Sequence, residues 1–96
     1  MIEVIKSSQF GAWLDAADSS VKVRVLARLS RVELGNFGDH CSVGDGVSEL
    51  RLFFGAGYRI YYMQRGNQVV IVLCTGDKST QIKDIQLAKK IALEWR

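Results

Sequence analysis

Proline is absent from the sequence, and cysteine and histidine are scarce. With only Cys41 and Cys74, a disulfide framework is not expected to stabilise the chain, and a cytoplasmic location is consistent with this usage. His40 is the only histidine and no CxxC or HxxxH spacing exists, so we expect no metal site and no Ser-His-Asp triad. No apolar run approaches the ~20 residues of a membrane span, and the first ten residues lack the apolar stretch of a signal peptide.

The composition that is present indicates one small folded domain. Hydrophobic residues make up 48% of the 96 residues, which excludes a disordered chain. The length is that of a single domain, so residues 1–96 are expected to form one unit with one modest core. The formal net charge of +3 is mild, so the placement of the basic residues matters more than their sum.

The first half of the chain predicts one strand followed by two helices. Residues 2–5 form a short, partly β-branched apolar run that favours a strand. Residues 10–17 carry apolar side chains at helical spacing after a serine pair that can supply a cap. A longer helix is expected from about Val21 to Leu34, with Gly35 in the left-handed position that commonly follows a helix.

Three arginines gather along this second helix. At about 100° per residue, Arg24, Arg28 and Arg31 fall within a narrow arc. The arc lies beside an apolar stripe formed by Val21, Val25, Leu29 and Val32. The arginine arc fits three interpretations: a solvated helix face, a docking surface for an acidic partner, or a surface that follows a phosphate backbone.

The second half predicts three antiparallel strands. Alternating residues at 47–54 and 58–65 are joined by the glycine-containing segment 55–57, which is typical of a hairpin. A two-residue turn then leads into the β-branched run 68–75. Residues 35–46 hold four of the nine glycines without periodicity, so a loop is expected there.

A final helix follows the turn at residues 76–81, where Ser79 or Thr80 is expected to act as a cap. Its apolar stripe consists of Ile85, Ala88, Ala92 and Trp95, and Ile91 lies beside it. The predicted fold is therefore α+β, in the order β-α-α-β-β-β-α. An N-terminal helical hairpin and a C-terminal helix would pack on an antiparallel sheet.

Pairing Phe54 with Tyr58 across the glycine loop separates the two faces of the central hairpin. One face is apolar and predicted to be core: Leu50, Leu52, Phe54, Tyr58, Ile60 and Tyr62. The other face carries Glu49, Arg51, Phe53, Arg59, Tyr61 and Met63. The two arginines on this face repel one another unless acids or anions lie between them. A purely structural explanation of their closeness is that Glu49 pairs with one of them. The functional explanation is a concave basic surface that holds a phosphodiester, with Tyr61 available to stack on a base or to donate a proton.

Glycine-rich phosphate-binding motifs are not complete in this sequence. Residues 55–57 lie between two strands, which does not fit a dinucleotide fingerprint. The segment Gly76-Asp77-Lys78-Ser79 resembles the end of a phosphate loop, but Ile71 stands where the first glycine is required. What remains is a lysine with two hydroxyls at a helix start, which suits an anion, although plain capping is the simpler interpretation.

Cleavage of RNA requires three kinds of assistance: deprotonation of the 2′-hydroxyl, neutralisation of the phosphate and protonation of the leaving 5′-oxygen. Because the chain lacks a pair of histidines, Arg, Lys and Tyr side chains would have to supply this assistance. Such a site implies an external factor that positions the RNA.

Two blocks of sequence carry a resemblance to a known family: GNFGDHCSVGDGVSELRLFFGAGYRIYY and GDKSTQIKDIQLAKKIA. With them the chain resembles the RelE/ParE toxin superfamily of toxin–antitoxin modules. More narrowly, it is similar to the HigB-like, phage-related branch of addiction-module killer proteins. The likeness covers nearly the whole chain, and the superfamily has the element order expected above.

The resemblance implies a toxin that a cognate helix-turn-helix antitoxin holds inactive. RelE- and HigB-type members are ribosome-dependent mRNA endonucleases, so the ribosome and mRNA are the implied partners, with no cofactor, metal or membrane. ParE-type members poison DNA gyrase instead, so a non-nucleolytic gyrase inhibitor is the alternative, and a degenerate domain without growth effect is a third.

Carried over by position, the resemblance implies a catalytic role for Arg51, Arg59 and Lys78, with Tyr61 or Tyr62 as the aromatic residue of the same strand. We expect Arg51 and Arg59 to counter phosphate charge. Lys78 would clamp the substrate or help to deprotonate the nucleophile, and Tyr61 would stack. The expected contacts to RNA or the ribosome are Arg24, Arg28, Arg31 and Lys83.

The chain departs from the nuclease pattern in its last residues. RelE- and HigB-type toxins commonly place a Tyr or His near the C-terminus as a catalytic group. This sequence has Ala92-Leu93-Glu94-Trp95-Arg96 there, so the resemblance names no general acid or base.

Overall fold

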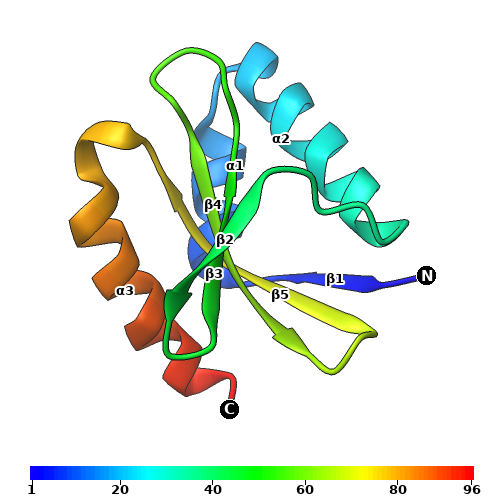
Figure 1. The fold of residues 1–96 in the computed structure, drawn as a ribbon. Coiled ribbons are helices and arrows are strands. Elements are labelled where there is room, and N and C mark those ends of the chain that lie inside the picture. The colour runs from blue at the N-terminus through cyan, green and yellow to red at the C-terminus, as the bar shows by residue number, and fades with distance from the viewer.

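The computed structural model describes all residues from 1 to 96 and has an α+β fold (Figure 1). In chain order its elements are β1 (Glu3–Lys6), α1 (Ser8–Ala16), α2 (Ser19–Glu33), β2 (His40–Gly44), β3 (Val47–Arg51), β4 (Arg59–Arg65), β5 (Val69–Gly76), the short 3-10 turn η1 (Lys78–Thr80) and α3 (Gln81–Glu94). None of the helices combines the length and the apolar character that crossing a membrane requires.

The sheet has five strands in the order β1-β5-β4-β3-β2. Strand β1 runs parallel to β5, whereas all other neighbours are antiparallel. The prediction of a purely antiparallel sheet is therefore wrong, and the sheet is mixed. Parallel neighbours need a long connection, and here the intervening chain between β1 and β5 supplies it.

Strand β2 occupies the segment that was expected to be a loop. It pairs antiparallel with β3, and a register shift between Ser42 and Gly44 bends it where the turn to β3 begins. The turn uses three consecutive residues with positive φ, namely Gly44, Asp45 and Gly46. Gly44 and Gly46, which were predicted to lie in a loop, thus form a tight turn after an edge strand. The element order therefore contains one strand more than predicted.

The two N-terminal helices begin and end where the sequence predicts. The Ser7 hydroxyl accepts a hydrogen bond from the Phe10 amide at 3.1 Å, which caps α1. Helix α2 is followed by Gly35 with φ 88°, the left-handed conformation that glycine adopts without strain.

Two hydrophobic cores lie on opposite sides of the sheet, with α1 and α2 on one side and α3 on the other (Figure 1). The first core includes Phe10 and Val25, together with the predicted apolar face of the central hairpin. The second core lies under α3 and includes the predicted stripe of that helix, with Ala88, Ile91 and Ala92 fully or almost fully buried.

The central hairpin has a different register from the predicted one. Leu50 lies opposite Ile60 and Arg51 opposite Arg59, and the Leu52 amide donates to the Tyr58 carbonyl at 2.9 Å. Tyr58 therefore faces Leu52 instead of Phe54, and the loop is wider than expected. Because the shift is two residues, every side chain stays on its predicted face.

Candidate functional site

The face of the hairpin that carries Arg51 and Arg59 is not an open surface. Helix α3 packs over much of it, and Tyr61 is 0% exposed. The Tyr61 hydroxyl is buried without a hydrogen-bond partner, and burial raises the pKa of Tyr61 far above its ordinary value. The prediction that Tyr61 is free to stack on a base is wrong, because the core side of α3 covers its ring.

Acidic side chains separate the two arginines of this face. Arg51 donates from Nη2 to Asp39 Oδ1 at 2.9 Å, and Arg59 Nε lies 3.5 Å from Glu49 Oε2. The hydrogen bond to Asp39 raises the pKa of Arg51. Two like charges directly opposite on neighbouring strands are tolerated because each has its own carboxylate. The pairing with Glu49 that the sequence suggested is therefore present.

Glu49 is the centre of a buried polar group under the start of α3. Its carboxylate accepts from Gln81 Nε2 at 3.3 and 3.4 Å and from Cys41 Sγ at 3.3 Å. Burial, followed by the bond to Glu49, raises the pKa of the Cys41 thiol. The side chain of Arg59 is 11% exposed, and its Nη1 donates to the Gly57 carbonyl at 3.1 Å. Glu49 and Gly57 together fix the direction of this guanidinium group.

Arg28 does not belong to a solvent-exposed arginine face. It is 8% exposed, and its guanidinium group donates to the carbonyl oxygens of Phe37, Asp39 and Arg51 at 2.7 to 3.2 Å. Burial lowers the pKa of Arg28. The prediction that Arg28 contacts RNA or the ribosome is wrong, because its donors join α2 to the segment before β2 and to the end of β3.

Arg59 and Lys78 meet at the β3–β4 loop, although they come from different elements. Both line one open hollow of about 530 Å³, together with residues 53–57 of the loop. The Lys78 amide donates to the Ala56 carbonyl at 3.3 Å, which holds η1 against the loop. Gly57, with φ 76°, lies between the two cations, since a Cβ atom there would be 3.4 Å from Lys78 Cβ and 3.8 Å from Arg59 Nη1.

Two further hollows adjoin this one and share residues with it. Phe53 and Phe54 also line a hollow that contains Arg24, Ala27, Arg28, Arg31 and Leu52. Lys78 also lines a hollow formed by residues 79–83 and Gln86, which includes Lys83. No Asp or Glu lines any of the three. We call these three hollows together the basic track. Four of its cations are exposed, and all four are among the candidate site residues of the sequence: Arg24, Arg31, Lys78 and Lys83.

The start of η1 is capped by the protein itself. The Asp77 carboxylate accepts from the Ser79 amide at 2.8 Å and from the Ser79 hydroxyl at 2.5 Å, and these bonds lower the pKa of Asp77. Thr80 completes a capping box and precedes α3. The segment is therefore capped as the simpler interpretation expected, but the capping side chain is Asp77 and not Ser79 or Thr80, and Thr80 makes no side-chain cap to α3. The Asp77 carboxylate occupies the position where an anion would bind.

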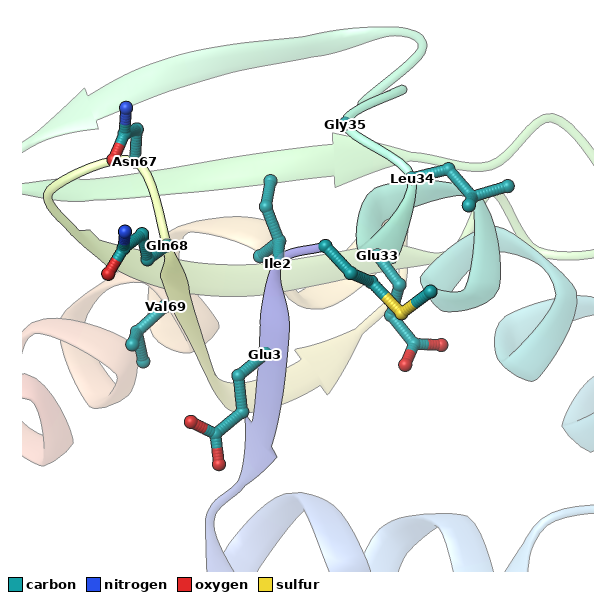
Figure 2. Close-up of a pocket in the computed structure, with 9 residues that line it drawn as sticks. Ile2, Glu3, Glu33, Leu34, Gly35, Asn67, Gln68 and Val69 are labelled. Carbon is teal, nitrogen blue, oxygen red and sulfur yellow. The ribbon is translucent and has the colours of Figure 1, made fainter.

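The largest hollow of the molecule lies elsewhere and has the opposite charge. It has a volume of about 790 Å³ and is framed by the start of β1, the end of α2 and the β4–β5 turn (Figure 2). Its charged side chains are Glu3 and Glu33, and it contains no Lys or Arg. None of the predicted site residues lines it. No group of three or more His, Cys, Asp or Glu side chains is close enough to hold a metal ion.

Comparison with known proteins places the chain in a family. The family described as "Phage derived protein Gp49-like (DUF891)" matches residues 12–93. An uncharacterized protein of Haemophilus influenzae is 45% identical over 94 residues, which cover 97% of this chain and 95% of that protein. The Gp49-like family is a RelE/toxin-like family, which in general implies an antitoxin partner. The chain therefore belongs to the phage-derived Gp49-like family.

Proposed function

We propose that this protein is the toxin of a type II toxin–antitoxin module, of the HigB-like branch, and that it acts as a ribosome-dependent mRNA endonuclease in the cytoplasm. The observation that carries the proposal is the hollow in which Arg59 and Lys78 converge without a lining carboxylate. A site of this kind attracts a phosphodiester and stabilises additional negative charge as the phosphate becomes crowded.

The proposed reaction breaks one phosphodiester bond of the message. The 2′-oxygen attacks phosphorus as its proton passes to solvent, and the bond from phosphorus to the 5′-oxygen breaks. The leaving oxygen takes up a proton from solvent, so the products are a 2′,3′-cyclic phosphate and a 5′-hydroxyl. Arg59 and Lys78 counter the charge on the phosphate, and Lys78 contacts the nucleophile. Arg51 lines none of the three hollows and is paired with Asp39, so its proposed charge-countering role rests only on its position opposite Arg59 in the hairpin.

The ribosome has a defined part in this proposal. The hollow contains no His, Asp or Glu that could transfer a proton, so acceleration must come from charge stabilisation and from placing the 2′-oxygen in line with the leaving oxygen. A message held in the decoding site is already positioned. Arg24, Arg31 and Lys83 would contact RNA or the ribosome along the basic track.

The same absence of a proton-transfer group favours one alternative, a ParE-type inhibitor that binds DNA gyrase without cleaving nucleic acid. A basic surface that only binds needs no general acid or base. The two functions differ in their cellular signature, because gyrase poisoning damages DNA and induces the SOS response, whereas an endonuclease produces cleaved transcripts.

The antitoxin is proposed to be a helix-turn-helix protein with an acidic or amphipathic segment that covers the basic track. Charge complementarity then predicts that its affinity falls as salt rises.

Induced expression in a bacterial host, with mapping of mRNA 5′ ends and an SOS reporter, tests the proposal. We expect growth arrest and new transcript ends within translated regions, without SOS induction. Lys78→Ala should reduce the cleavage rate about a hundredfold, because it removes one cation from the hollow. Lys90→Ala is the matched control, since Lys90 is an exposed lysine of α3 that lines none of the three hollows.

Arg59→Lys is the second variant of choice, because an alanine would leave Glu49 buried without its cation. It retains one positive charge beside Glu49 but loses the planar fork that binds phosphate. Full toxicity of both Lys78→Ala and Arg59→Lys contradicts the site. SOS induction without cleaved transcripts identifies the gyrase alternative, and the absence of any growth effect identifies a degenerate domain.

A further inference from the structure

We propose that Phe53 is a base-stacking platform at the centre of a path for single-stranded RNA that follows the basic track. The inference rests on the proposed function and extends it, because it assigns a role to an aromatic residue and a course to the bound strand. Phe53 would take the stacking role that the buried Tyr61 is unable to perform.

Phe53 is exposed in a way that sets it apart from the other aromatic side chains. It is 80% exposed, whereas the adjacent Phe54 is partly buried against the first core. The Phe54 ring lies 5.2 Å from the Tyr58 ring, and Arg24 lies over it with Cζ 4.7 Å from its centroid. Leu52 and Phe54 both pack in the first core, so the Phe53 side chain between them points away from that core, toward solvent.

The position of Phe53 joins two of the three hollows. It lines the hollow of Arg24 and Arg31 and also the hollow of Arg59 and Lys78. A strand whose phosphates lie in these two hollows would therefore pass over the Phe53 ring. Stacking on an exposed ring is open to every base, since each base has a flat π face.

The arrangement of the elements keeps this platform in place. The β3–β4 loop projects at the end of the molecule where α2 and α3 begin (Figure 1). Gly55 and Gly57 take positive φ values of 54° and 76°, and the Gly57 amide donates to the Phe54 carbonyl at 3.0 Å. The bond from the Lys78 amide to Ala56 attaches the loop to η1. The ring is thus exposed while the backbone that carries it is anchored.

An acidic peptide segment is the competing occupant of the same surface. The lining residues favour RNA, because an acidic peptide would need the cations but would gain little from a single exposed ring between them. RNA supplies both components, a charged backbone and flat bases, at neighbouring positions along one strand.

Binding of a fluorescently labelled, ten-nucleotide single-stranded RNA with 2′-O-methyl groups, measured by anisotropy at low salt, tests this inference on the purified protein. The methyl groups block cleavage, so binding is measured separately from catalysis. We expect Phe53→Ala to weaken binding about tenfold and Phe53→Trp to bind within about twofold of the unchanged protein. Leu93→Ala is the matched control, since Leu93 is 66% exposed and lies on α3 away from the basic track, and its binding should not change.

The salt dependence of binding separates stacking from charge. Lys78→Ala and Arg31→Ala should each make binding less steeply dependent on salt concentration, whereas Phe53→Ala should leave the slope unchanged. The melting temperature should be the same for Phe53→Ala and the unchanged protein, because the side chain is exposed.

Three results would overturn the inference: no RNA binding by the unchanged protein, equal binding by Phe53→Ala, or a loss that Phe53→Trp does not restore. If Phe53→Ala loses binding to a polyglutamate peptide but still binds RNA, the surface is assigned to an acidic partner instead. Uncleaved transcripts in induced cells, together with Phe53-dependent RNA binding, would reject the endonuclease while retaining the platform.

Discussion

The two sides of the sheet are built on different principles. The core beneath α1 and α2 consists of apolar and aromatic side chains. The core beneath α3 shares its space with polar groups, among them Glu49 and Arg59. Three polar atoms on this second side are buried without hydrogen-bond partners: Arg51 Nε, Arg59 Nε and Tyr61 Oη. One such atom, Thr75 Oγ1, lies on the first side, because Thr75 is paired with Ile60 of the first core.

This difference separates stability from function within a chain of 96 residues. Each large apolar side chain that is fully buried contributes about 1.5–3 kcal/mol, whereas a buried polar atom without a partner costs about 1–3 kcal/mol. The larger cost of unpartnered polar atoms therefore falls on the α3 side. The same side holds the Arg59 guanidinium group in a fixed direction beside the basic track.

The largest effect on stability is expected at Arg28, a buried arginine on the α1–α2 side of the sheet. Arg28→Ala should lower the free energy of unfolding by about 3 kcal/mol, because three carbonyl groups lose a charged donor at once. Urea denaturation followed by circular dichroism measures the change. Arg31→Ala, an exposed arginine of the same helix, should change stability by no more than about 0.5 kcal/mol. Equal effects of the two substitutions would show that the hydrogen bonds of Arg28 do not stabilise the fold.

A smaller effect of opposite sign is expected on the α3 side. Tyr61→Phe should leave stability unchanged or raise it by up to about 1 kcal/mol, because it removes a buried hydroxyl that has no partner and keeps the ring. Toxicity should also persist, since Tyr61 does not reach the surface. Tyr61→Leu is the control for the ring and should destabilise the protein. A loss of more than about 1 kcal/mol in Tyr61→Phe would reveal a partner for the hydroxyl.

The smallest effect is expected at the exposed start of η1. Because hydrogen bonds from Ser79 lower the folded-state pKa of Asp77, its stabilising contribution is complete above the ordinary value of 3.8. The contribution is lost as the pH falls below 3.8 and through the lower folded-state value. A titration of the Ser79 amide by NMR should show a midpoint below 3.8. Asp77→Asn should abolish the titration, and a midpoint above 3.8 would contradict the cap.

Local sequence signals predicted the elements whose pattern depends on close neighbours. The Ser7 cap, the end of α2 at Gly35, the stripe of α3 and both faces of the hairpin all follow from spacing along the chain. Strand β2 was missed because its pairing with β3 is formed across space and its own residues alternate only weakly in burial. The register of the hairpin was wrong by two residues, because the alternating pattern is the same for either loop width.

The candidate site shows the same limit. Arg28 lies three residues after Val25 and four before Val32, so the helical period already places it at the margin of the apolar stripe. That signal could have identified it as buried. The burial of Tyr61 had no comparable signal, because it depends on which sheet face α3 covers. Phe53 was placed on the correct face but was given no role, since exposure at the end of a strand is a tertiary property.

The parallel pairing of β1 with β5 has a consequence for biosynthesis. Residues 66 positions apart meet at this seam, where the Ser7 hydroxyl donates to the Leu73 carbonyl at 2.6 Å. Such distant contacts make folding slow and place it late. During translation, β1 has no strand neighbour until β5 has left the exit tunnel. A nascent fragment released before that point cannot complete the sheet and does not acquire the mature surface.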